Sequence, residues 1–362
     1  MITGGGTGGH IFPAVAVATE LRDRFGADVL FIGALGRMEM EKVPAAGFPI
    51  EGLPISGLQR SLKPENLLFP FKLISSVVKA GKILKRFRPD AVAGFGGYAS
   101  GPTLRAAIRM KIPVAIQEQN AFPGLVNRWI GPKANKIFVA HNGLEKWFPA
   151  DKILVTGNPV RATAIAVEGK KEEALATFGF EAGIPTLLIV GGSQGALSVN
   201  RAVTKHLGLF ADNGYQVLWQ TGKYFYDEAC KALEAFPGKK IKAVTFIDRM
   251  DLAYALADVV VSRAGAIAIS EICAVGVPPV LVPLPTAAED HQTKNAQALA
   301  EADAAFLLPD NKAGEDLGQV VSQLMSDREM RDRFSKNLKR LAKPDAAKNI
   351  AEEIIKLAGE NK

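Results

Sequence analysis

Five glycines fill six positions near the start of the chain, in the run Gly4–Gly9. Such a run has almost no side-chain volume, so a ligand can approach the backbone closely. Proline suits the first turn of a helix, so we expect Pro13 to open a helix over 14–25. A helix N-terminus after a glycine loop offers N–H groups and a positive dipole end, which favour phosphate. His10 stands at this junction, where a tight turn or a phosphate loop has no structural need of an imidazole, although capping or packing is an alternative role for it.

Short apolar runs alternate with helical patterns along the chain, which indicates a parallel α/β sheet. Two such series follow one another, and each opens with a glycine-rich junction from strand to helix. We therefore expect two doubly wound parallel-sheet domains, with a hinge at 157–159 and ligands in a cleft at the carboxyl ends of both sheets. The expected strands cover residues 28–32, 91–93, 114–116 and 137–139, then 186–190, 217–219, 244–246, 259–261 and 280–282.

Two further glycine clusters lie at expected strand-to-helix junctions, over 94–102 and 191–196. Another junction, Ser262–Glu271, ends a strand, turns and opens a helix. Glu271 lies about one and a half turns inside this helix, where its carboxylate can accept hydrogen bonds from a ribose diol or complement the helix dipole. Downstream, Gln292 offers a donor and an acceptor to sugar hydroxyls, or is an ordinary polar residue of a helix start. Together these loops favour a phosphate-rich ligand.

The composition excludes several protein classes. A chain of 362 residues that is 48% hydrophobic can bury large cores. No apolar run approaches the ~18 residues of a membrane span, and no signal-peptide pattern opens the sequence. Two cysteines, Cys230 and Cys273, are too few for a disulfide framework and suit a reducing compartment. Four scattered histidines and the lack of an Asp-x-Asp motif predict neither a metal site nor a cofactor.

Charge is distributed unevenly along the chain. Residues 1–159 hold 20 basic and 11 acidic residues, a balance of +9, whereas the remainder has a balance of −2. This asymmetry favours an anionic partner for the first half, with ordinary solubility charge as the alternative. The stretch 67–87 mixes apolar residues with lysines, which suits an anionic membrane surface at about 1 kcal/mol per basic residue. A packed helix with a solvated lysine face is the other interpretation. The basic residues of this stretch are Lys72, Lys79, Lys82, Lys85 and Arg86.

A dinucleotide site is a weak alternative for the first loop. Gly4, Gly6 and Gly9 satisfy the GxGxxG spacing, but that fingerprint also needs an acid at the end of the second strand to hold a ribose. The expected second strand runs into apolar and small residues, and the first acid after it is Glu39. We therefore rank NAD binding low.

The ordered series of motifs resembles the MurG family, the N-acetylglucosaminyltransferases that convert lipid I to lipid II in bacterial peptidoglycan synthesis. No single motif is unique to that family, but the resemblance spans essentially the whole chain. The matching segments are Gly4–Ala14, Gly96–Tyr98, Glu118–Asn120, Gly157–Arg161, Gly191–Ala196, Phe246–Ile247 and Ser270–Glu271, together with Gln292 and Asn295.

The resemblance implies a GT-B fold of two Rossmann-like domains. Residues 1–159 would form the acceptor and membrane-facing domain, residues 160–344 would bind UDP-GlcNAc, and a C-terminal helix within 345–362 would cross back to the first domain. Its apolar face would hold Ala347, Ile350, Ala351, Ile354 and Ala358. The implied donor contacts are Ile247 for uracil, Glu271 for ribose, Gln292 for GlcNAc, and Arg161, Ser193, Ala266, Ile267, Ala268, Ile269 and Ser270 around the diphosphate. The implied acceptor contacts are Thr7, Gly8, Gly9 and Asn120.

The chemistry implied by the resemblance is one in-line displacement with inversion, from UDP-GlcNAc to the 4-hydroxyl of MurNAc in lipid I. This reaction needs a base for the hydroxyl proton and positive potential for the departing UDP, which helix dipoles and Arg161 can supply without a metal. His10 is the preferred general base, because an imidazole titrates near neutral pH. Glu118 is the rival candidate.

The implied partners are UDP-GlcNAc, lipid I, the anionic inner leaflet of the cell membrane and proteins of cell-wall synthesis and division, without nucleic acid. The implied location is the cytoplasmic face of the cell membrane, as a peripheral protein. Two other classes stay open: a UDP-GlcNAc 2-epimerase, which would need no membrane stretch, and a non-catalytic nucleotide-sugar sensor. One departure from the family pattern is that only Met1–Thr3 precede the first glycine loop, so either the start is truncated or the first strand is very short.

Overall fold

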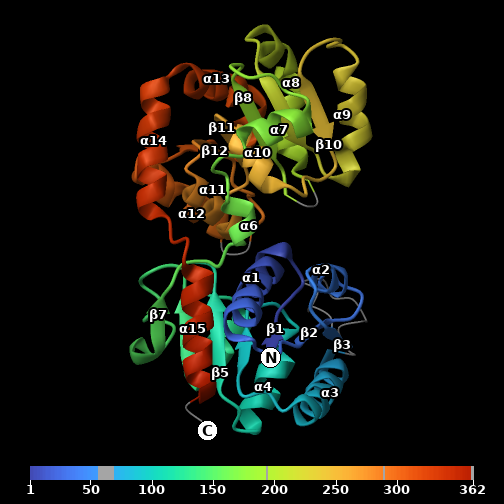
Figure 1. Cartoon of the computed structure of the whole chain (residues 1–362), viewed down its shortest axis with the longest axis vertical. Helices are drawn as coiled ribbons and strands as arrows, with labels where there is room; N and C mark the ends of the chain where they lie inside the picture. The colour runs from blue at the N-terminus through green and yellow to red at the C-terminus, as the bar shows by residue number, and fades with distance from the viewer. Residues whose placement is uncertain (56–68, 193–194, 288–289, 360–362) are drawn as a thin grey trace. The chain divides into compact units, whose positions relative to one another are not determined.

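The computed structural model describes residues 1–55, 69–192, 195–287 and 290–359. It divides the chain into two compact units (Figure 1). The first unit consists of Met1–Arg161 together with Lys343–Lys362, and the second of Ala162–Ala342. Each unit is built on its own parallel sheet with helices on both faces, as the alternation of apolar runs and helical patterns predicts.

The sheet of the first unit has seven strands in the order β3-β2-β1-β4-β5-β6-β7, and every neighbouring pair is parallel. Its inner strand β1 has only two residues, and Ile2 pairs with Phe31 on one side and with Ala93 on the other. A strand of two residues therefore precedes the first glycine loop. The strands are β1 Ile2–Thr3, β2 Phe31–Ala34, β3 Ile50–Leu53, β4 Val92–Gly94, β5 Val114–Glu118, β6 Lys136–Val139 and β7 Ile153–Val155.

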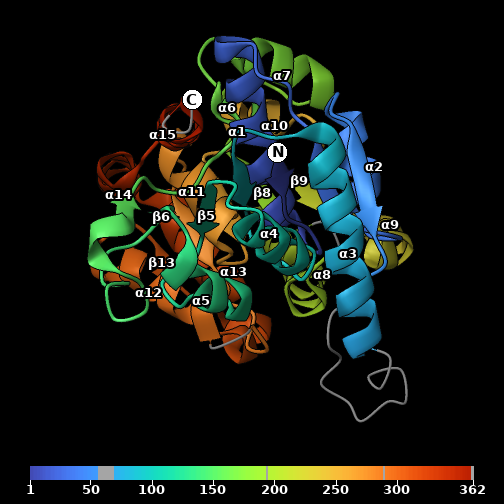
Figure 2. The ribbon, with the colours of Figure 1, turned by 90° about the horizontal axis from the view of Figure 1, so that it is seen from below.

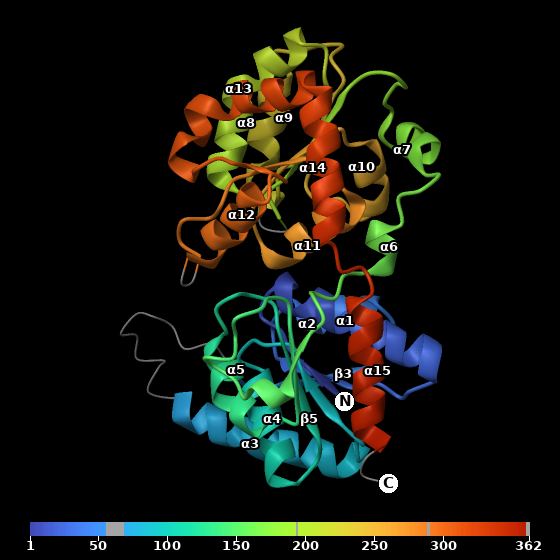
Figure 3. The same ribbon diagram turned by 90° about the vertical axis from the view of Figure 1, so that its left-hand side faces the viewer.

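Helices cover both faces of this sheet, which explains why its strands are apolar on both sides. On one face α15, Ala346–Gly359, packs beside α1, Gly8–Phe25 (Figure 3). On the other face α3, Phe69–Phe87, packs along α4, Ser100–Arg109 (Figure 2). Shorter α-helices in the described part of this unit are α2 Glu39–Ala45 and α5 Leu125–Ile130. The predicted apolar face of the C-terminal helix is confirmed, since Ala347, Ile350, Ala351 and Ile354 are buried and Ala358 packs against the same core.

The start of α1 differs from the sequence prediction. The helix begins at Gly8, because the Thr7 carbonyl already accepts hydrogen bonds from the N–H groups of His10 and Ile11. The predicted opening at Pro13 is therefore wrong. Pro13 lies inside the helix, where it has no N–H to donate to the carbonyl four residues earlier. As a result, His10 belongs to the first turn of α1.

The sheet of the second unit has six parallel strands in the order β10-β9-β8-β11-β12-β13. Its core is built around the fully buried Trp219. The strand expected at 244–246 is wrong in position: the ladder to β9 ends at Val244. The strands are β8 Thr186–Val190, β9 Gln216–Gln220, β10 Ile241–Val244, β11 Val259–Ser262, β12 Pro279–Leu281 and β13 Phe306–Leu307. The helices are α6 Ala162–Ile165, α7 Lys171–Phe178, α8 Leu197–Asp212, α9 Tyr226–Leu233, α10 Met250–Leu256, α11 Ala266–Val275, α12 His291–Glu301, α13 Ala313–Ser326 and α14 Arg328–Leu341.

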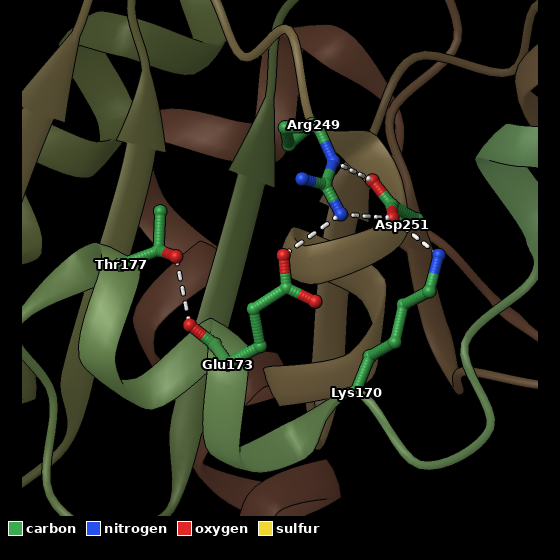
Figure 4. A network of polar contacts seen from close by, with 5 residues as sticks. All are labelled: Lys170, Glu173, Thr177, Arg249 and Asp251. Atoms are coloured by element: carbon green, nitrogen blue, oxygen red, sulfur yellow. Dashed lines mark hydrogen bonds and ion pairs between the residues drawn. The ribbon is translucent and has the colours of Figure 1, made fainter.

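A charged network connects α7 with α10 in the second unit (Figure 4). The buried carboxylate of Asp251 accepts hydrogen bonds from Lys170 Nζ at 2.6 Å and from Arg249 Nε and Nη2 at 2.9 and 2.8 Å. Arg249 also lies 3.1 Å from Glu173. The hydrogen bonds from Arg249 and Lys170 hold the pKa of Asp251 well below its ordinary value. Asp251 therefore fastens α7 to the start of α10.

Two kinds of feature are missing from the described ranges. None of their helices combines the length and the hydropathy needed to cross a bilayer. Within the same ranges, no cluster of three or more His, Cys, Asp or Glu side chains could hold a metal ion.

Candidate functional site

The glycine-rich loops lie where each sheet reverses its strand order. In the first unit the order reverses between β1 and β4, and the loops 4–9 and 94–102 follow those two strands. In the second unit it reverses between β8 and β11, which are followed by the glycine pair 191–192 and by the junction after Ser262. Ligands of open α/β sheets bind beyond the carboxyl ends of strands at such switch points. Each unit therefore has its own candidate site, and the motifs singled out in the sequence lie around both.

In the first unit, the glycine loops 4–9 and 94–102 contact one another, and the close approach of their backbones requires glycine. Gly97 has a φ of +81°, which disfavours other residues, and a Cβ atom there would stand 2.2 Å from the carbonyl oxygen of Gly5. A Cβ atom on Gly96 would stand 3.0 Å from Nε2 of His10. The His10 ring therefore packs against the backbone of the second loop.

His10 is half-buried, and its Nδ1 lies 3.0 Å from the carbonyl oxygen of Gly5 and 3.2 Å from Oγ1 of Thr7. A carbonyl oxygen only accepts hydrogen bonds, so Nδ1 carries the proton and donates it. In the neutral ring this leaves the lone pair on Nε2. Burial lowers the pKa of His10, while the Gly5 carbonyl and the charge of Glu39 act in the opposite direction. The imidazole can thus accept a proton at Nε2 at neutral pH.

Glu118, at the end of β5, is buried, and its two oxygens accept four hydrogen bonds. Oε1 receives the backbone N–H of Asn120 at 3.0 Å and its side-chain amide at 3.4 Å. Oε2 receives the backbone N–H of Gly124 at 3.0 Å and the Asn127 amide at 2.9 Å. Burial raises the pKa of Glu118, and these donors counteract that rise. Because a carboxylate accepts about four hydrogen bonds, Glu118 has the environment of a loop anchor and holds Asn120 in place.

Glu39 is a residue of this site that the sequence analysis missed. It opens α2, is fully buried, and its carboxylate accepts the N–H of Gly6 at 2.9 Å and the N–H of Ala34 at 3.0 Å. The fold thus brings an acid to the end of β2, where a dinucleotide site would need one. Because that acid is bound to backbone beneath the glycine loop, it is not presented to a ribose. The only signal in the sequence was an acidic residue shortly after the second strand.

Arg161 ends the N-terminal segment of the first unit, Met1–Arg161. Its guanidinium carbon stacks 4.8 Å from the centre of the Phe12 ring in α1. Among the described residues, no acceptor takes the hydrogen of its buried Nε. The stack places a delocalised positive charge beside the helix that carries His10.

In the second unit, Gln220 links the third glycine loop to Ile247. Its Nε2 donates to the carbonyl oxygen of Gly192 at 3.0 Å, and its Oε1 accepts the Ile247 N–H at 2.9 Å. Ile247 is buried, and its N–H is already used in this contact. A base bound at Ile247 therefore has the backbone carbonyl to pair with, unless it replaces Gln220. Ser193, the candidate in this loop, lies outside the described residues.

The junction after β11 presents a helix N-terminus, as predicted. Gly265 caps α11, and the candidates Ala266, Ile267, Ala268, Ile269 and Ser270 form its first turns. Glu271 follows on the buried side, where Tyr254 Oη donates to its Oε2 at 3.2 Å. Arg263 is fastened by Asp310, by Ser198 and by the carbonyl oxygens of Val282 and Pro283, so its charge is used inside the unit.

Gln292 lies in the first turn of α12, and its Oε1 accepts the backbone N–H of Leu284 at 3.0 Å. This contact orients the side chain and leaves its amide hydrogens as the groups that could meet a sugar hydroxyl. Asn295, one turn later, is buried and donates to the carbonyl oxygen of Ala264 at 3.2 Å. The start of α12 is thereby fixed to the junction that opens α11.

Comparison with known proteins identifies relatives over the whole length of the chain. Residues 1–139 match the Glycosyltransferase family 28 N-terminal domain, and residues 186–350 match the Glycosyltransferase family 28 C-terminal domain. A protein of Flavobacterium psychrophilum is 46% identical over 364 residues, covering 100% of this chain and 98% of the relative. One of Parabacteroides distasonis is 49% identical over 358 residues, covering 99% and 97%. Both are named UDP-N-acetylglucosamine–N-acetylmuramyl-(pentapeptide) pyrophosphoryl-undecaprenol N-acetylglucosamine transferase.

Solved structures match the fold of this chain over nearly its whole length. The crystal structure of MurG from Acinetobacter baumannii superposes with a TM-score of 0.77 at 31% identity, covering 98% of this chain and 99% of that one. A UDP-GlcNAc 2-epimerase from Neisseria meningitidis, bound to UDP-GlcNAc, reaches a TM-score of 0.67 at 15% identity, covering 98% and 99%. The second likeness concerns the fold alone.

Proposed function

The chain belongs to glycosyltransferase family 28, as a member of its MurG family, and we propose that its first unit binds the lipid-linked acceptor and its second unit the nucleotide sugar. It is an inverting N-acetylglucosaminyltransferase, which moves GlcNAc from UDP-GlcNAc to the 4-hydroxyl of MurNAc in lipid I and gives lipid II for peptidoglycan synthesis.

For the donor, we place the ribose at Glu271 and the diphosphate at the start of α11. The N–H groups of the first helical turn have no acceptors within the helix and are available to bind an anion there. The carbonyl of Ile247 is the pairing group for uracil, held in position by Gln220. The amide of Gln292, oriented by Leu284, meets the GlcNAc hydroxyls. Arg161 adds positive charge for the diphosphate, and Ser193 adds a hydroxyl donor.

For the acceptor, we place the sugar and its diphosphate at Thr7, Gly8, Gly9 and Asn120. Among the described residues, no acceptor takes the N–H groups of Gly8 or Gly9, which open α1. The Gly6 N–H is directed to Glu39 and does not take part. Asn120 is held by Glu118 through its N–H and its amide, which leaves its Oδ1 for a hydroxyl.

His10 is the general base in this proposal, and its hydrogen bond to the Gly5 carbonyl is the observation that carries it. That bond fixes the proton on Nδ1 and the lone pair on Nε2, so the ring can take the proton of the 4-hydroxyl as the oxygen attacks the anomeric carbon. Glu118 already accepts four hydrogen bonds, which favours the role of an anchor. Transfer of radiolabelled GlcNAc to lipid I by the full chain and by its His10 variants tests the assignment.

The outer surface of α3 supports a peripheral location at the cytoplasmic face of the cell membrane. Phe71, Ile74 and Val78 are 72%, 63% and 54% exposed and recur at the spacing of one helix face. Lys79, Lys82 and Lys85 are exposed on the same helix, and Lys72 is half-buried. Exposed apolar residues among lysines suit the anionic inner leaflet, where the undecaprenyl chain of the acceptor is embedded. The residues 56–68 that precede this helix lie outside the described ranges.

A further inference from the structure

The buried position of Glu39 is unfavourable in free energy unless its carboxylate is well hydrogen-bonded. Its side chain is fully buried, and moving a carboxylate out of water costs several kcal/mol unless good partners replace the water. It accepts the N–H group of Gly6, in the loop after β1, and the N–H group of Ala34, the last residue of the neighbouring strand β2. The proposed reaction gives it no role.

The backbone around Glu39 is shaped to admit this side chain. A Cβ atom on Gly5 would stand 2.2 Å from Oε1 of Glu39, and one on Gly33 would stand 2.6 Å from its Cγ. Gly6, which donates to the carboxylate, has a φ of +87°, in the region that favours glycine. Three glycines, two in the loop after β1 and one in β2, therefore accommodate one acidic residue.

The peptide group between Gly5 and Gly6 connects Glu39 to His10. Its N–H donates to Oε2 of Glu39 at 2.9 Å, and its carbonyl oxygen accepts from Nδ1 of His10 at 3.0 Å. Both contacts use one rigid, planar group, and hydrogen bonds in such a chain polarise one another. If this peptide turned, the acceptor that selects the His10 tautomer would move with it.

We propose that Glu39 is a positioning residue for His10: by holding the N–H of the Gly5–Gly6 peptide, it aims the Gly5 carbonyl at Nδ1 and keeps the lone pair on Nε2. The inference rests on the proposed role of His10 as the base. Glu39 itself touches neither substrate, and it acts through one peptide group. Its removal should therefore lower kcat and leave the KM for UDP-GlcNAc unchanged.

The ring nitrogens of His10 report this link directly. The chain has four histidines, so ¹⁵N-histidine labelling of the full chain gives a resolvable spectrum, and His10→Ala identifies the His10 signals. Glu39→Gln keeps the size of the side chain, but its amide group can accept only one of the two N–H groups. Glu41→Gln is the matched control, because Glu41 is exposed on the same helix and the charge change is the same.

We expect a single Nδ1–H tautomer in the parent and in Glu41→Gln, and a mixture of tautomers in Glu39→Gln. We also expect kcat on lipid I to fall roughly ten- to a hundredfold in Glu39→Gln, by analogy with the loss of an outer-shell partner that orients a metal-bound histidine. If Glu39→Gln does not fold, Glu39→Asp, which keeps the charge but shortens the reach, should show the same mixture.

Two results would overturn the proposal. In the first, His10 keeps the single Nδ1–H tautomer in the folded Glu39 variant. Glu39 then only supports the first glycine loop. In the second, the tautomers mix but kcat is unchanged. The kcat of His10→Ala then shows where the failure lies, because an unchanged value in that variant means that His10 is not the base.

Discussion

The guanidinium carbon of Arg161 lies 4.8 Å from the centre of the Phe12 ring, two residues after His10 in α1. The stack fixes a planar cation by its face, so the edge with its N–H groups is left to meet an anion. The charge proposed for the leaving diphosphate is therefore oriented by the same helix that carries the proposed base.

We expect Arg161→Ala to lower kcat/KM for UDP-GlcNAc by about tenfold or more, since a hydrogen bond to a charged group contributes about 1.5–3 kcal/mol. Arg161→Lys keeps the charge but not the planar stack, and should recover only part of the loss. Steady-state kinetics with saturating lipid I measure both variants. Full activity of Arg161→Ala would contradict the assignment.

His10→Ala should lower kcat by ~10²–10⁴, the usual effect of losing a general base, with little change in the KM for UDP-GlcNAc. The base works when it is deprotonated, so kcat should fall as the pH drops through its pKa. Since burial lowers the pKa of His10, this limb should lie below pH ~6.5 and be absent in His10→Ala. Glu118→Gln is the comparison, and it should keep the acidic limb while lowering thermal stability. Loss of the limb in Glu118→Gln instead would identify Glu118 as the base.

Glu271→Gln should raise the KM for UDP-GlcNAc by about five- to tenfold, because a charge-assisted hydrogen bond to the ribose diol becomes a neutral one and loses about 1–1.5 kcal/mol. The amide keeps the size of the side chain, so the circular dichroism spectrum should match that of the parent. Tyr254→Phe removes only the hydroxyl that contacts Glu271, and should have a smaller effect in the same direction. An unchanged KM in Glu271→Gln would show that the ribose binds elsewhere.

Replacing Lys72, Lys79, Lys82 and Lys85 with glutamine should weaken binding to vesicles that contain anionic lipid, and should reduce the salt dependence of that binding. Phe71→Ser with Ile74→Ser should weaken binding to the same vesicles without changing its salt dependence, because these residues contribute apolar area. Vesicle co-sedimentation at two ionic strengths measures both effects, and activity on a short-chain, soluble acceptor should be kept. Binding equal to that of the parent would leave α3 as a packed helix with a solvated lysine face.

Asp251→Asn should destabilise the second unit by about 2 kcal/mol at pH 7, because the buried carboxylate loses its charge-assisted bonds to Arg249 and Lys170. The pKa of Asp251 is lowered in the folded state, so its contribution is present above the ordinary pKa of an aspartate, ~3.9, and is lost as the pH falls toward the folded value. Urea unfolding at pH 7 and pH 3 should show a smaller difference at pH 3. Glu173→Gln removes only an exposed partner and should change the unfolding free energy by less than about 1 kcal/mol. A difference for Asp251→Asn that is independent of pH would contradict this reading.

Much of the fold follows from local patterns. The strand Thr186–Val190 was predicted to the residue, because a buried run of apolar residues ends at a glycine pair. The strands Ile2–Thr3 and Phe306–Leu307 have two residues each, which is too short for any periodicity to show. The prediction at 244–246 placed β10 too late, because Thr245 and Phe246 look like strand residues although the ladder to β9 has already ended at Val244. Pairing between strands is not visible in a local window.

For the candidate site too, some features could be predicted from the sequence and others could not. Glycine loops and the start of α11 could be located in the sequence because their signals are contiguous. The role of Glu39 could not, because its partner Gly6 lies 33 residues earlier and contributes only a backbone N–H. The four donors around Glu118 were invisible for the same reason, since two of them are also backbone groups.

The position of α15 in the core of the first unit has a consequence for how the chain folds during synthesis. This helix packs beside α1, near the beginning of the chain, yet it leaves the ribosome after the whole second unit. At roughly 5–20 residues per second, the nascent first unit must wait on the order of ten seconds or more with the apolar surface of α1 uncovered. The second unit, which is continuous in sequence, can fold in that interval. The unit that can be complete first is therefore the one translated second, and the face of α1 that α15 covers stays exposed until the end of the chain has been made.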